Sequence, residues 1–175
     1  PIDSGVTESR ACFTQVVKVL GIRTSQSCEG HIDAGCPYPW IEFEVPLVKV
    51  RVPPIWKIMS YRTRMDAKKQ RELNMENARL KAGQIRSVIN NYIISYSSEH
   101  KITLENLFHV TSMWRSFRIQ PVFDSYSESL RVSGHVAALS FLLEVQRDIL
   151  LDLAKYISQE ICSNPNFQGV TEEGC

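Results

Sequence analysis

An apolar stripe through residues 130–162 constrains the fold of this chain more than any other feature of its sequence. Its members recur at helical spacing, and a helix would place them on one face. We therefore predict a central core helix, which ends at Ser163, Asn164 and Pro165 because the residue before a proline disfavours helical geometry. Gly134 is either a weak point near the start of this helix or the position at which it begins. The stripe consists of Val132, Val136, Leu139, Leu142, Leu143, Ile149, Leu150, Leu153, Ile157 and Ile161.

Residues 66–98 predict a second long helix whose two halves differ. Residues 67–84 are polar and rich in strong helix formers, whereas the second half is amphipathic. We expect the second half to pack and the first half to project, with Gly83 as a candidate bend. The projecting half is either a solvated face or an arm that binds a partner. The amphipathic positions are Ile85, Val88, Ile89, Tyr92, Ile93 and Tyr96.

Two shorter helices are also predicted. Residues 11–20 place Phe13, Val16, Val17 and Leu20 on one face, and this helix should end at Gly21. Thr103 is a good N-cap for a helix over residues 104–117. That helix would have the apolar residues Leu107, Phe108, Val110, Met113, Trp114 and Phe117.

The most regular alternation of apolar and charged residues lies between Trp40 and Trp56. It predicts two extended segments, residues 41–45 and 48–52, which form either a hairpin or one long strand with a bulge at Pro46 and Leu47. In the hairpin, Glu44 faces Lys49 and Glu42 faces Arg51. Because an isolated ribbon is marginal in water, it must lie on the helices or pair with another chain. The predicted partner contacts are Trp40, Ile41, Phe43, Val45, Val48, Val50 and Trp56. The alternative is that the two tryptophans cover the end of the core.

The cysteines fall into two clusters where the apolar pattern is poor. They are Cys12, Cys28 and Cys36 near the start, and Cys162 and Cys175 at the end. This distribution favours disulfides and an oxidising, extracytoplasmic compartment. We favour a bridge between Cys162 and Cys175 that holds the last loop on the central helix, with one thiol of the five left over.

Charge is distributed unevenly along a chain whose net charge is only +1. Residues 57–86 contain nine basic and three acidic residues, whereas residues 121–175 contain three basic and eight acidic ones. The basic segment is either paired with the acidic one or exposed to an acidic partner. The balanced total argues against nucleic acid as a partner, and there is no apolar run long enough to span a membrane.

Signatures of catalysis and of cofactor binding are absent from the sequence. Cys28, His31 and Cys36 are possible zinc ligands, but a fourth ligand is not evident, so no metal or cofactor is predicted. His109 and His135 fit core or rim positions better than catalytic ones. Ion pairing explains Glu42 and Glu44 more simply than acid–base chemistry.

Together these features predict a mainly α fold: an antiparallel bundle of long helices with an extended β-hairpin and a disulfide-stapled N-terminal segment. The expected divisions are residues 1–39, 40–61 and 62–175. We expect a non-enzymatic extracytoplasmic module, a component of a cell-envelope or surface assembly, that docks on a protein partner or a second copy through its ribbon and polar helix. A membrane contact of the ribbon is a lesser option, and no small-molecule substrate is implied. The alternatives are a secreted helical-bundle ligand for a receptor and a thiol- or zinc-dependent enzyme.

Overall fold

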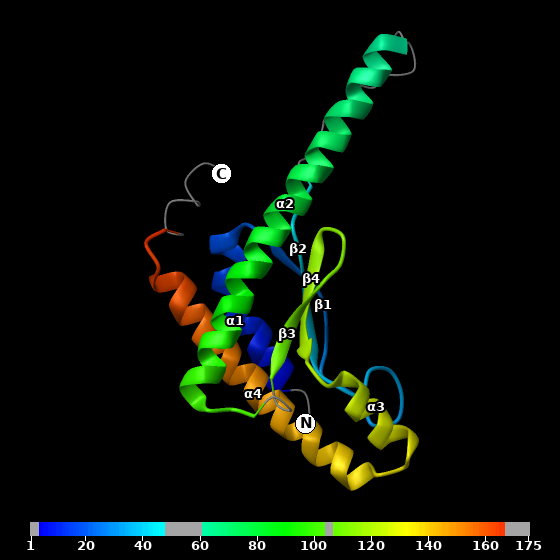
Figure 1. Ribbon diagram of the computed structural model, residues 1–175, viewed down its shortest axis with the longest axis vertical. Helices are drawn as coiled ribbons and strands as arrows, with labels where there is room; N and C mark the ends of the chain where they lie inside the picture. Colours follow the sequence, from blue (N-terminus) through cyan, green and yellow to red (C-terminus); the bar gives the residue numbers. More distant parts are fainter. Residues whose placement is uncertain (1–3, 48–60, 104–106, 167–175) are drawn as a thin grey trace.

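The computed structural model describes residues 4–47, 61–103 and 107–166 of the chain. Over these residues the chain forms helices and one small antiparallel sheet (Figure 1), which confirms the predicted mainly α class. None of the helices in these ranges is long and apolar enough to cross a membrane. The elements are α1 Ser4–Leu20, β1 Arg23–Cys28, β2 Trp40–Glu44, α2 Tyr61–His100, β3 Phe108–Ser112, β4 Ser116–Pro121, α3 Asp124–Val132 and α4 Val136–Ser163.

The predicted central helix is two helices, α3 and α4, separated by a turn. Gly134 adopts a positive φ of 73° in this turn, a conformation that favours glycine. The amide nitrogen of His135 donates to the carbonyl oxygen of Leu130 at 2.9 Å and closes the end of α3. From Leu139 onward the stripe is buried as predicted except at Leu142 and Ile149, which are partly buried. Val132 and Val136 are exposed because the turn removes them from the core.

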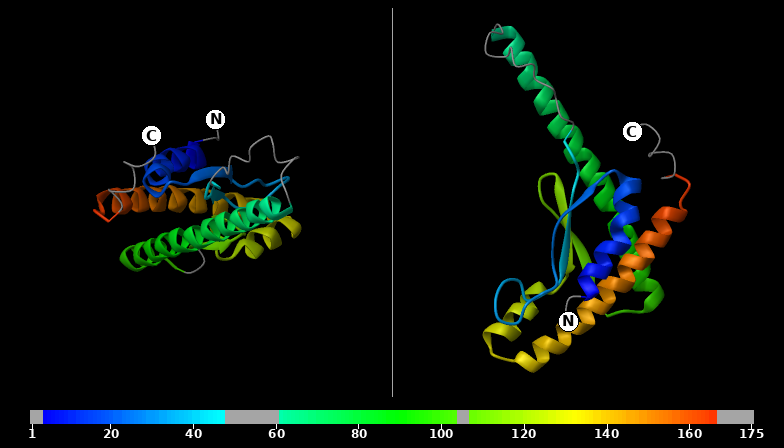
Figure 2. Two further views of the ribbon diagram at one scale, coloured as in Figure 1. Left: turned by 90° about the horizontal axis from the view of Figure 1, so that it is seen from above. Right: turned by 180° about the vertical axis from the view of Figure 1, so that it is seen from behind.

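Helix α1 lies beside α4 and runs in the same direction (Figures 1 and 2). It buries Phe13, Val16 and Leu20 and ends at Gly21, as predicted, where φ is 61°. The predicted antiparallel bundle is not observed, because α2 and α4 cross instead of lying along each other (Figure 1). They meet where Tyr96 of α2 contacts Tyr156 of α4, with ring centroids 5.5 Å apart.

The sheet has the strand order β1-β2-β4-β3, with antiparallel neighbours. Ile41 and Phe43 of β2 face the helices, and Phe43 contacts Phe13 of α1 and Phe117 of β4 at centroid distances of 5.1 and 5.4 Å. Since β1 and β4 occupy both edges of β2, the predicted hairpin partner cannot pair there. That partner, residues 48–52, lies outside the described residues.

The predicted third helix, residues 104–117, is wrong over its described part. Residues 108–121 instead form the β3–β4 hairpin. Phe117 and Ile119 alternate with Arg118 and Gln120, and this period of two lets β4 bury one face against the helices. The apolar residues fit both the period of a helix and the period of a strand. Pairing with β2, which is distant in sequence, selects the strand.

The N-terminal segment is not held by disulfides in this structure, since Cys12, Cys28 and Cys36 are unbridged. The predicted partner of Cys162, Cys175, lies outside the described residues. Arginines instead hold the loop between β1 and β2: Arg147 donates to the carbonyl oxygens of Glu29 and Gly30 at 2.8 and 3.0 Å. Arg131 donates to the carbonyl oxygen of Gly35 at 2.5 Å.

Candidate partner-binding site

The described residues of the predicted ribbon site lie inside the core. Trp40, Ile41, Phe43 and Val45 are at most 8% exposed, so their side chains already contact the chain itself. Val48, Val50 and Trp56 lie outside the described residues. The ring of Trp40 is covered by the guanidinium group of Arg118 at 3.8 Å, on the face of β2 that bears Glu42 and Glu44.

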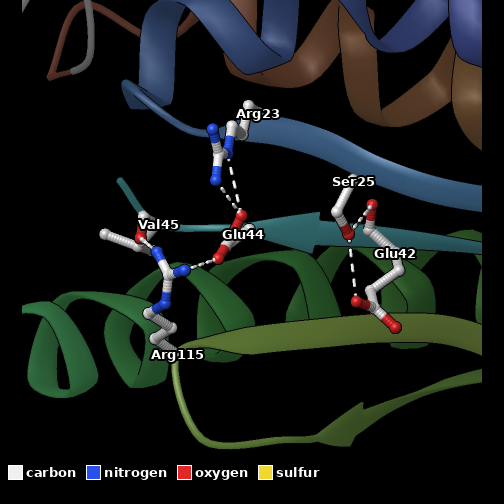
Figure 3. Close-up of polar contacts among 6 residues, drawn as sticks. All are labelled: Arg23, Ser25, Glu42, Glu44, Val45 and Arg115. Carbon is white, nitrogen blue, oxygen red and sulfur yellow. Dashed lines mark hydrogen bonds and ion pairs between the residues drawn. The ribbon is translucent and has the colours of Figure 1, made fainter. Parts of the chain in front are cut away.

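The carboxylates of β2 form ion pairs with arginines of other segments than the predicted ribbon partner. Figure 3 shows the two ion pairs of Glu44. Glu44 accepts from Nε of Arg23 at 2.8 Å and also pairs with Arg115. Glu42 accepts from the Ser25 hydroxyl and from Arg118, both at 3.0 Å. Lys49 and Arg51, the predicted partners, lie outside the described ranges, and β1, β4 and the turn before β4 supply these arginines instead.

These ion pairs fix the turn between β3 and β4. Arg115 donates to the carbonyl oxygen of Val45 at 3.3 Å, and the amide of Val45 donates to the carbonyl oxygen of Arg115 at 3.1 Å. The amide of Met113 donates to the carbonyl oxygen of Ser116 at 2.9 Å and closes the turn. Met113 and Trp114, which were predicted to pack in a helix, are 47% and 53% exposed at its tip.

A cleft of about 460 Å³ lies between this turn and α2. One wall is cationic because Arg79 and Arg86 line it, and neither forms an ion pair or a hydrogen bond with the described part of the chain. The other wall contains the exposed side chains of Met113 and Trp114 together with Ser112 and Ser116. The lining residues are Arg79, Ala82, Gly83 and Arg86 of α2, and Ser112, Met113, Trp114, Ser116 and Phe117 of the hairpin.

Beyond the cleft, the first half of α2 extends away from the other described elements (Figures 1 and 2). We call residues 64–77 the arm. Its side chains are mostly exposed, including Leu73 at 59%, and so is Leu80 just beyond it. The charged residues over residues 64–84 are Arg64, Lys68, Lys69, Arg71, Arg79 and Lys81 against Asp66, Glu72 and Glu76. The arm itself has four basic and three acidic residues, and Arg79 and Lys81 beyond it make residues 64–84 basic overall. Its exposure fits the predicted projecting polar half.

The candidate zinc ligands do not come together as a metal site. Among the described residues, no group of three or more His, Cys, Asp or Glu side chains is arranged to hold a metal ion. The amide of Gly30 donates to Sγ of Cys28 at 3.4 Å, and His31 is exposed. Burial raises the pKa of the Tyr38 hydroxyl, and the Cys36 thiol beside it contributes to the rise.

His109 is half-buried on the face of the sheet that bears the ion pairs. Burial lowers the pKa of its imidazole below 6.5, and the carboxylate of Asp124 opposes part of this shift. This environment fits the rim position predicted for it. His135 is exposed and contacts the Ser133 hydroxyl at 2.7 Å.

Sequence reasoning missed Arg79, Arg86 and Trp114 as a group. The spacing of the two arginines was a usable signal, because it places Arg79, Gly83 and Arg86 on one face of a helix. The position of Trp114 opposite them depends on the β3–β4 hairpin, which the helical interpretation concealed. No protein-family model, curated protein or solved structure matches this chain.

Proposed function

We propose that this chain is a non-enzymatic protein-binding module that docks on an acidic partner through the arm of α2. The observation that supports the proposal is the arm, a mostly exposed stretch of helix that extends beyond the other described elements and continues into Arg79 and Lys81, so that residues 64–84 contain six basic and three acidic residues. In a chain whose net charge is +1, this local excess of positive charge favours association with an acidic protein surface.

The anchoring of α2 suits it for binding. Its second half is held by a buried stripe, which comprises Ala78, Ala82, Ile85, Ile89, Ile93 and Tyr96. The arm continues the same helix without a break at Gly83. A segment that is already ordered loses little conformational entropy when a partner binds, so more of the contact energy appears as affinity.

The arm is better suited to an acidic surface than to pairing with a second copy of itself. Leu73 and Leu80 are seven residues apart and share one face, as in a coiled coil. However, a coiled coil needs a second apolar position in each heptad, and Lys69 and Glu76 occupy the candidate positions. The two leucines therefore add local apolar contacts to an interface whose selectivity is electrostatic.

Site-specific photo-crosslinking in the cells that produce the protein tests this proposal. A photoreactive phenylalanine analogue replaces Leu73, and as a matched control it replaces Phe141, an apolar residue of α4 that is 69% exposed. We expect a discrete adduct with an acidic protein from position 73 only, which is lost in the Lys68→Glu/Lys69→Glu variant. Equal adducts from both positions, no adduct, or insensitivity to the charge reversal would overturn the proposal.

We also propose an extracytoplasmic location as part of a larger assembly at the cell envelope or surface. Because Cys12, Cys28 and Cys36 are unbridged, this location depends on the predicted bridge between Cys162 and Cys175. A thiol count on protein purified without reductant should then find three free thiols and one disulfide. Five free thiols would remove the basis for this location.

A further inference from the structure

We propose that the cleft between α2 and the β3–β4 turn binds an extended peptide segment in which acidic and apolar residues alternate. This inference rests on the proposed function, for which it names the chemistry of the partner. The cleft lies at the base of the arm, so a partner that lies along the arm reaches it without a change in the fold.

The cationic wall specifies the acidic residues. Arg79 and Arg86 are two helical turns apart, about 10.5 Å along the axis of α2. Their guanidinium groups have no carboxylate partner among the described residues, so both can bind a ligand. Arg115 of the turn differs because it pairs with Glu44, which Arg23 also contacts. An arginine pairs with a carboxylate through two parallel hydrogen bonds, which are stronger than hydrogen bonds between neutral groups.

The opposite wall specifies the apolar residues between them. Met113 and Trp114 line it with side chains that are 47% and 53% exposed, and the amide of Met113 donates to the carbonyl oxygen of Ser116. In an extended peptide, successive side chains point to opposite sides. Acidic side chains at alternate positions can therefore face α2 while the intervening apolar side chains face Trp114. Acidic residues two positions apart in such a peptide are separated by about 6.6 Å, and those four positions apart by about 13 Å. The axial separation of the two arginines, about 10.5 Å, lies between these values.

Gly83 provides the space between the two arginines. It lies between Arg79 and Arg86 on the same face of α2, and a Cβ atom placed on it would have no neighbour within 4 Å. A larger side chain there would begin from an unobstructed Cβ position and extend into the cleft. This position therefore offers a way to block the cleft and leave the fold intact.

Fluorescence anisotropy with the full chain and a labelled Glu-Leu-Glu-Leu-Glu peptide tests the proposal. We expect binding that falls by at least about tenfold in the Arg79→Gln/Arg86→Gln variant, because charge-assisted hydrogen bonds are lost. We expect the same loss in Gly83→Leu but not in Gly83→Ala, and a partial loss in Trp114→Ala. A Gln-Leu-Gln-Leu-Gln peptide should not bind, and Glu-Ser-Glu-Ser-Glu should bind more weakly than the leucine peptide.

The control variant is Lys101→Gln/Lys155→Gln, which removes the same charge from exposed positions outside both the cleft and the arm. It should keep peptide affinity within about twofold, since charges at more than a Debye length are largely screened. No binding by the native chain, equal loss in this control, or no loss in Gly83→Leu would overturn the proposal. Tighter binding of a single-stranded oligonucleotide, lost in the same cleft variants, would also overturn it and would assign the cleft to nucleic acid.

The two proposals fail in different ways. If the leucine peptide does not bind but position 73 still crosslinks to an acidic protein, the cleft proposal alone fails. If the peptide binds through the cleft but position 73 gives no adduct, docking through the arm fails and the cleft remains. Denaturation midpoints equal to the native value would show that each variant used in these comparisons is folded.

Discussion

The two halves of α2 have opposite surroundings although they belong to one continuous helix. From Ala78 to Tyr96 a buried stripe joins the helix to α4 and the sheet, whereas residues 64–77 are mostly exposed and rich in charge of both signs. The packed half fixes the direction of the helix, and the arm has that direction because the helix does not break between them. Stability and recognition are therefore separated along one element, so each can be changed alone.

The largest expected contrast is between truncations in the two halves. Ile89 is fully buried, and Ile89→Ala should reduce the free energy of unfolding by about 2–5 kcal/mol because it leaves a cavity. Leu73 is 59% exposed, and Leu73→Ala should change it by less than about 0.5 kcal/mol. Urea denaturation of both variants measures the difference. Similar losses in the two variants would mean that Leu73 supports the fold and is not free for a partner.

Ion pairs should show the same contrast with a smaller effect. The side chain of Glu42 is 12% exposed, and Glu42→Gln should reduce stability by about 1–3 kcal/mol because Arg118 loses its charged acceptor. Glu72 pairs with Lys68 at 3.9 Å on the exposed arm, and Glu72→Gln should reduce stability by about 0.5 kcal/mol or less. Denaturation at low and high salt checks both values. A large, salt-sensitive loss in Glu72→Gln would contradict the separation.

Gly83, which lies within the packed stretch and lines the cleft, should respond in the opposite direction. Gly83→Ala should raise the free energy of unfolding by about 0.5–1 kcal/mol, because glycine has more conformational freedom to lose and the new methyl group meets no neighbour. Thermal denaturation measures the gain. A loss of stability would show that the helix needs the flexibility of glycine there, and the arm would then be jointed and not rigid.

The sequence predicted features that depend on local periodicity and missed those that depend on distant pairing. The spacing of Leu139, Leu143 and Leu150 identified the core helix. The change of character predicted at Gly83 indicated two halves of α2, although the buried stripe begins earlier, at Ala78. Phe108 and Phe117 fit both a helix and a strand, and only pairing with β2 decided between them. The candidate site was missed for the same reason, since Trp114 faces Arg79 only once the hairpin exists.

The smallest expected effect concerns pH, and it should arise in the packed region and not in the arm. Burial lowers the pKa of His109 below its ordinary value of about 6.5, so the folded chain binds fewer protons than the unfolded chain just below that pH. Stability should therefore fall as the pH drops from about 6.5 through the lowered pKa, and this contribution should level off below it. His109→Gln should make the pH profile flatter in this window, whereas His31→Gln, which removes an exposed imidazole, should leave it unchanged. Denaturation midpoints measured between about pH 7.5 and 5 check both variants, because this range brackets the ordinary histidine pKa of about 6.5. If the two substitutions flatten the profile equally, the pH response does not come from the burial of His109. The sheet would then shield His109 from solvent no more than the loop between β1 and β2 shields His31.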